Sequence, residues 1–106
     1  MTLLVSRCKI TVIKRTLDVE LISEFLDEKR GSLKPCEGCA DGQEYMVTEL
    51  FSPPKGFCPW AWADIRHAVA RVATGGQLPG LRMEGVEIAG CTDWFRPVIF
   101  KIERID

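Results

Sequence analysis

Alternating polar and apolar positions near the N-terminus predict a first β-strand. In residues 7–15, apolar Cys8, Ile10 and Val12 alternate with polar residues. Successive side chains of a strand point to opposite faces, so this period of two places the apolar set on one face. Cys8 is in line with Ile10 and Val12, and free cysteine is among the most often buried residue types. We therefore expect Cys8 to be a small core residue.

The pattern changes to helical spacing in residues 18–30. Asp18 suits the N-cap, acidic residues crowd the early turns, and Gly31 follows as a stop. The segment is therefore predicted to be an amphipathic helix with a solvated acidic face and one apolar stripe, made of Val19, Leu21, Ile22, Phe25 and Leu26.

A second helix is predicted over residues 59–74. Cys58 takes the N-cap position and Pro59 the first helical position, where the fixed φ of proline fits and its missing N–H is not needed. The Gly75-Gly76 pair ends the helix. The apolar stripe contains Trp62, Ile65, Val69, Val72 and Ala73. Trp60 and Trp62 are two residues apart and cannot share a face, so one is expected in the core and the other beside Cys58.

The remaining periodic segments predict three more strands. They cover residues 44–51, 86–91 and 95–105, and the last two flank Thr92-Asp93-Trp94 as an antiparallel hairpin. Residues 31–42 are rich in glycine and have no period, which is typical of a loop. Because each helix has a single apolar stripe, the sequence predicts one α+β domain over residues 1–106, in the order strand-helix-strand-helix-strand-strand, with a mainly antiparallel sheet and both helices on one face.

Composition narrows the classes of function. A chain of 106 residues that is 46% hydrophobic suits a single core, and its formal net charge of −1 provides no positive field for nucleic acid. No run is long enough to span a membrane, and no export signal is evident, so we expect no membrane partner and a cytoplasmic location. Thiols stay reduced there, so the five cysteines are expected to be free, metal-bound or redox-active.

Four of the five cysteines suggest chemistry by their positions. Cys36 and Cys39 form a C-x-x-C pair with Gly38 between them, which lets two sulfurs converge on one ion or on each other. Alone this is half of a zinc site. Cys58 begins a helix, where the dipole in general favours a thiolate. Cys91 ends a predicted strand.

Three stretches also carry a resemblance to a known family. They are Cys36 with Gly42, residues 56–64 (GFCPWAWAD), and residues 91–104, which begin Cys-Thr-Asp and continue Arg-Pro-Val-Ile-Phe. Over nearly its whole length the chain resembles a family of small bacterial and archaeal proteins of uncharacterised function. The resemblance implies a prokaryotic ancestry and no activity. Members usually have glycine in place of Trp94 and another residue in place of Cys39. The resemblance therefore implies that a site shared by the family contains Cys36, Cys58 and Cys91.

The first functional hypothesis is a cysteine-based site. Cys36, Cys58 and Cys91 lie in loops or at element ends, unlike Cys8, and are expected to converge with Cys39 or His67 as a fourth group. Such a site would hold zinc or an iron–sulfur unit, or would cycle through a disulfide.

Two alternatives remain open at this stage. One is a non-catalytic module that binds a small ligand or peptide in an aromatic cleft formed by Trp60, Asp64, Asp93, Trp94 and Arg96. The other is an enzyme with Cys58 as the nucleophile, for which the sequence assigns neither a base nor its orienting partner. The sequence therefore does not predict a classical enzyme, and it leaves the oligomeric state open.

Overall fold

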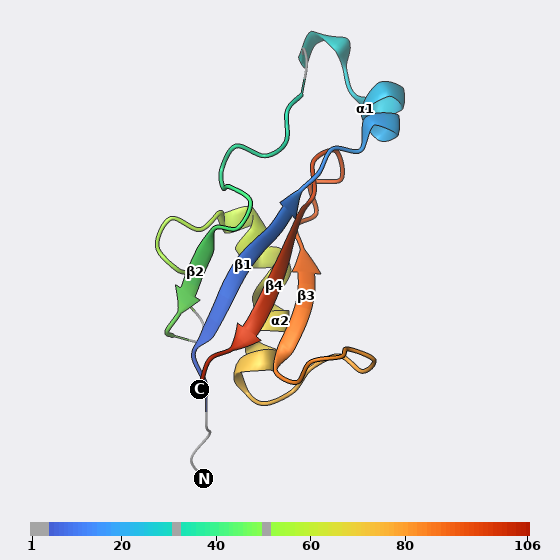
Figure 1. The fold of residues 1–106 in the computed structure, drawn as a ribbon. Helices are drawn as coiled ribbons and strands as arrows, with labels where there is room; N and C mark the ends of the chain where they lie inside the picture. The colour runs from blue at the N-terminus through green and yellow to red at the C-terminus, as the bar shows by residue number, and fades with distance from the viewer. Residues whose placement is uncertain (1–4, 31–32, 50–51) are drawn as a thin grey trace.

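The protein has the predicted α+β fold and the predicted order of elements (Figure 1). The structure, a computed structural model, describes residues 5–30, 33–49 and 52–106. Its elements are β1 (Cys8–Arg15), α1 (Val19–Phe25), the short 3-10 helix η1 (Glu28–Arg30), β2 (Glu44–Val47), α2 (Pro59–Ala73), β3 (Val86–Gly90) and β4 (Val98–Arg104). No helix in these described ranges has the length and apolar character needed to cross a membrane.

The four strands form one antiparallel sheet in the order β2-β1-β4-β3. Ile10 in β1 is opposite Tyr45 in β2 on one side and Ile102 in β4 on the other. The first and last strands of the chain are therefore the two central ones. The β3–β4 hairpin is confirmed, because Gly90 pairs with Ile99 next to the connecting turn.

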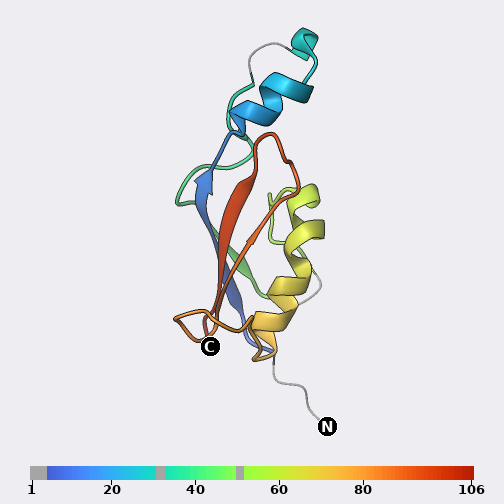
Figure 2. The same cartoon turned by 90° about the vertical axis from the view of Figure 1, so that its right-hand side faces the viewer.

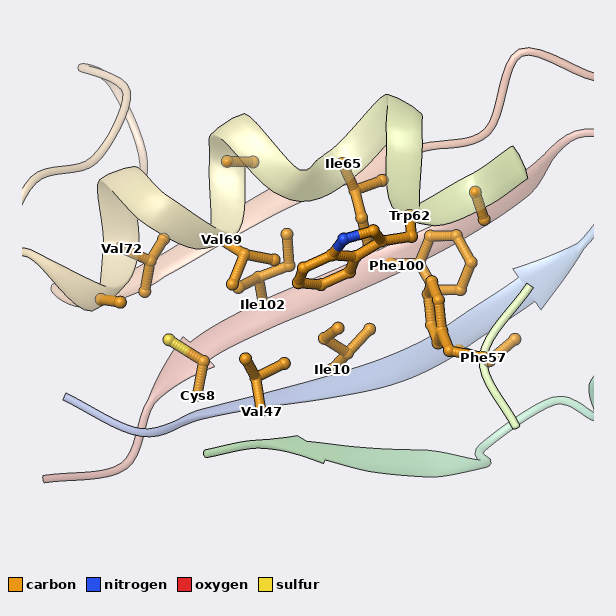
Figure 3. Packing of buried hydrophobic residues seen from close by; sticks show 14 of the residues in the cluster. Cys8, Ile10, Val47, Phe57, Trp62, Ile65, Val69, Val72, Phe100 and Ile102 are labelled. Atoms are coloured by element: carbon orange, nitrogen blue, oxygen red, sulfur yellow. The ribbon is translucent and has the colours of Figure 1, made fainter. Parts of the chain in front are cut away.

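Helix α2 covers one face of this sheet, and the core lies between them (Figure 2). The predicted stripe faces inward: Ile65, Val69 and Val72 have no exposed surface. Figure 3 shows these side chains above Ile10 and Ile102 of the central strands, with the other core residues around them. Cys8 is also fully buried, as predicted.

The ends of α2 agree with the sequence prediction. Cys58 is the N-cap in an extended conformation and Pro59 begins the helix. Gly75 has a φ of 96°, a value that suits the absence of a Cβ, and it ends the helix at the predicted place. Trp62 is buried in the core while Trp60 remains 64% exposed, so the two tryptophans separate as expected.

The position of α1 corrects the prediction that both helices pack on one face. None of its residues is buried, and among the described residues it comes close to no strand and not to α2. Figures 1 and 2 show it beyond the end of the sheet. The reason lies in the connection from β1: Thr16 N donates to Pro97 O at 2.9 Å and Asp18 N to Phe95 O at 2.9 Å. These bonds extend the pairing with the β3–β4 turn and carry the chain past the sheet before the helix begins.

Three predicted boundaries also change. The first helix stops at Phe25 because Leu26 is extended, and the β2 strand stops at Val47. The last strand begins at Val98 instead of residue 95, because the Asp93 carboxylate accepts from the N–H groups of Phe95 and Arg96 and folds them into a turn. The predicted stop at Gly31 and the predicted strand end at residues 50–51 lie outside the described residues.

One buried charge was not predicted. Glu87 in β3 is 1% exposed and forms an ion pair with Arg71 of α2, whose Nε donates to it at 2.8 Å. The backbone N–H of Leu78 donates to the same carboxylate at 3.2 Å. The pair attaches α2 and the following loop to the edge strand of the sheet.

Candidate functional site

A pocket of about 640 Å³ opens at the end of the molecule where α1 lies. Four segments surround it: α1 and Leu26, the loop of residues 33–39, the start of α2, and the β3–β4 turn. Phe57 and Phe100 line it where it meets the core. Four of the five cysteines are in the lining, namely Cys36, Cys39, Cys58 and Cys91.

Cys36 and Cys39 line the pocket from the same short loop, and Cys36 is close enough to affect the pKa of Cys39. The loop is held against β1, because Arg15 Nη1 donates to Cys36 O at 2.9 Å and Arg15 Nε donates to Asp41 Oδ1 at 3.1 Å. Burial raises the pKa of the Cys39 thiol to about 11, and the neighbouring Cys36 adds to the rise while Arg15 opposes it. Cys39 is therefore protonated at neutral pH in the free protein.

Cys91 follows β3 directly and is held against the start of β4. Its N–H donates to Val98 O at 3.1 Å, and its Sγ accepts from Val98 N at 3.4 Å. An amide N–H that points at sulfur is one of the contacts by which proteins tune cysteine ligands. Cys58, in contrast, is exposed, and its side chain forms no capping bond with the helix it begins. The Cys91 sulfur is therefore held by a hydrogen bond, whereas the Cys58 sulfur forms no bond with its helix.

A hydrogen-bonded chain connects the segments that contain these two cysteines. Asp64 Oδ2 accepts from Thr92 N at 2.7 Å and from Thr92 Oγ1 at 2.9 Å. Trp60 Nε1 donates to Thr92 Oγ1 at 2.8 Å. The start of α2 is therefore bound to the turn after β3, which places Cys58 and Cys91 at the same end of the molecule. Asp64, expected in the cleft, instead positions Thr92 and is not part of the pocket lining.

The other four residues expected in the cleft do line the pocket. Trp60 and Trp94 are 64% and 66% exposed. Asp93 Oδ2 accepts from Arg96 Nε at 3.0 Å, so the carboxylate and the guanidinium form an ion pair within the turn. The pocket therefore combines thiols, exposed indole rings and one oriented arginine.

Sequence reasoning missed part of the wall. The stripe of α1 was recognised but assigned to the core, whereas Leu21, Phe25 and Leu26 line the pocket together with Leu33. Tyr45 lies in the strand predicted over residues 44–51, and the sequence predicts no role for it in the site. Its ring lies edge-on to Phe57, with 4.9 Å between ring centres, and burial followed by the nearby Cys39 raises its pKa. His67 is exposed on α2 and is not in the lining.

The thiols share a pocket but do not form a preassembled metal cage. Among the described residues, no three His, Cys, Asp or Glu side chains are arranged to hold a metal ion as they stand. The chain matches no protein-family model, no curated protein and no solved structure. The family resemblance of the three sequence stretches therefore stays a prediction.

Proposed function

We propose that the pocket is a thiolate site for a soft metal centre, zinc or an iron–sulfur unit. The observation that carries the proposal is the distribution of the cysteines. Three separate segments direct Cys36, Cys39, Cys58 and Cys91 to one pocket, while Cys8 is buried in the core. Clustered thiols are prone to oxidation, and four cysteine sulfurs are a common ligand set for both centres.

In this proposal Cys36 and Cys39 receive the metal first, because only two residues separate them on a single loop and both line the pocket. Cys91 is the third ligand and retains the N–H bond from Val98. Cys58 has no competing side-chain bond to its helix and turns in as the fourth. A thiol must lose its proton to bind metal, so the raised pKa of Cys39 makes binding stronger as pH rises toward 11.

The test is metal binding by protein purified without oxygen. We expect bound zinc or iron in elemental analysis, and one equivalent of Co²⁺ that produces sulfur-to-cobalt charge-transfer absorption in the metal-free protein. Cys36→Ser, Cys58→Ser and Cys91→Ser should each weaken Co²⁺ binding by about tenfold or more, the loss expected when a site is disturbed. Cys8→Ala is the matched control, because it removes a cysteine outside the pocket and should bind as the wild type does.

Two results would contradict this function. One is a purified protein without metal that shows no charge-transfer band with Co²⁺ and in which all five thiols titrate freely. The other is a band that is lost equally in the Cys8→Ala protein, since that would show a general dependence on cysteine number instead of a site.

A second candidate function uses the same C-x-x-C pair without metal. The C-x-x-C spacing of Cys36 and Cys39, which both line the pocket, favours a reversible disulfide. An incoming disulfide would be reduced to two thiols while the pair loses two protons and two electrons to form its own bond. Reduction of a small aromatic disulfide by the Cys36→Ser protein at the wild-type rate would exclude this candidate and leave the metal proposal untouched.

A further inference from the structure

The pocket is much larger than a metal centre requires. Its volume of about 640 Å³ falls within the roughly 300–1,000 Å³ of sites that hold small organic molecules. Its lining is mainly apolar and aromatic, and four of its twenty described lining residues are cysteines. Such walls with a few convergent polar groups are typical of small-molecule sites.

Helix α1 forms part of the pocket wall but contributes no residue to the core. It buries no residue and packs on no other described element, although Phe25, Leu21 and Leu26 line the pocket. Phe25 is 67% exposed, and Trp60 and Trp94 are exposed to a similar extent. Three large rings are thus placed where an apolar molecule in the pocket would remove them from water.

The charged groups of the pocket lining are Arg96 and Asp93. Arg96 is the one arginine or lysine among the described lining residues. Its Nε is bound to Asp93, whose other oxygen accepts from two backbone N–H groups, so the ion pair is rigidly placed in the turn. The bonds seen for the guanidinium involve only Nε, and its two terminal amino groups match the paired oxygens of a carboxylate.

We propose that the pocket binds a small aromatic carboxylate, with its ring between α1 and the two exposed tryptophans and its carboxylate on Arg96. A small molecule fits better than a macromolecule because the site is a concavity enclosed by four segments instead of a flat face. This binding does not depend on the metal site, so the two proposals succeed or fail separately.

The test is isothermal titration calorimetry of the whole chain with two probes of the same shape, 2-naphthoate and neutral 2-naphthamide. We expect saturable binding of one 2-naphthoate per chain. The amide should bind about tenfold more weakly, because a hydrogen-bonded charge pair is worth about 1.5–3 kcal/mol and each 1.4 kcal/mol is a factor of ten.

Three variants assign the contacts. Phe25→Ser should weaken 2-naphthoate binding by about tenfold through the lost ring contact. Val19→Ser is its matched control: Val19 is on the same helix, is equally exposed at 68%, and is not in the lining, so binding should be unchanged. Arg96→Gln should bind both probes equally. Far-ultraviolet circular dichroism confirms that each variant is folded.

Four outcomes overturn the proposal. They are no saturable binding of 2-naphthoate, equal affinity of the wild type for the two probes, equal loss of binding in Val19→Ser and Phe25→Ser, and preference for the carboxylate in folded Arg96→Gln. Light scattering on the same samples tests the competing possibility, in which a second copy of the chain occupies the pocket. A dimer that fails to bind 2-naphthoate, and that Phe25→Ser converts to monomers, would assign this face to a second copy of the chain.

Discussion

The two helices of this protein have similar apolar stripes but differ in how much of the stripe is buried. Helix α2 buries seven residues against the sheet, whereas α1 buries none and lies beyond the end of it. The difference comes from the connections, since backbone bonds from Thr16 and Asp18 to the β3–β4 turn carry α1 away from the face that α2 covers. An apolar stripe on a helix therefore indicates a surface that packs against another group. The segment that leads into the helix determines whether that group is the core of the domain.

The cysteines divide in the same way between the two ends of the molecule. Cys8 is buried beside β2 and the C-terminal end of α2, where Figure 3 shows it near Val47 and Val72. The other four line the pocket at the opposite end. One end of the molecule thus encloses a single cysteine in the core, and the other end presents the remaining four in a pocket.

The largest effect on stability should come from shortening a buried side chain of α2. Ile65→Ala removes a fully buried side chain over the central strands, and we expect a loss of about 2–5 kcal/mol in the free energy of unfolding, from lost burial and the cavity left behind. Urea denaturation followed by circular dichroism measures it. A loss below about 1 kcal/mol would show that α2 does not hold the core.

A smaller loss is expected where the start of α2 is bound to the turn after β3. Asp64→Ala removes the acceptor for both the N–H and the hydroxyl of Thr92, and hydrogen bonds to a charged group are worth about 1.5–3 kcal/mol. The same variant should weaken Co²⁺ binding, because Cys58 and Cys91 are then no longer held at one end. Glu84→Ala, a change at an exposed acid outside the pocket, is the control for both measurements.

The pH dependence of thiol reactivity should separate Cys39 from an ordinary thiol. Because its pKa is raised to about 11, the thiolate fraction of Cys39 increases about tenfold per pH unit from pH 8 to pH 10. Iodoacetamide labelling, followed peptide by peptide in mass spectrometry, should show this rise. Cys8, whose pKa is raised by burial and whose sulfur is enclosed, should stay unlabelled over the same range. A plateau for Cys39 below pH 9 would contradict the assigned burial.

The smallest effect on stability should come from the helix that forms the pocket wall. Phe25→Ser changes a side chain that is 67% exposed, so the free energy of unfolding should change by less than about 0.5 kcal/mol while 2-naphthoate binding falls. A stability loss near that of Ile65→Ala would remove the contrast between the two helices.

Local signals in the sequence were sufficient for the elements and for much of the core. The alternation around Ile10 and the helical spacing around Ile65 depend only on neighbouring residues, because the periods of strands and helices are properties of the backbone. The same is true of the Cys58-Pro59 helix start and the Gly75 stop. The α+β class and the order of elements follow from these periods.

Only the tertiary structure determined how the ends of these elements meet. The placement of α1 depends on bonds between Thr16 and Pro97, 81 residues apart, and the link from Asp64 to Thr92 spans 28 residues. Neither pair leaves a periodic trace in the sequence, because one exposed or half-buried polar residue has many possible partners. The sequence therefore pointed to four cysteines and two tryptophans that line the pocket. The pocket that four of the cysteines share, and the use of α1 as its wall, arise from contacts between distant segments.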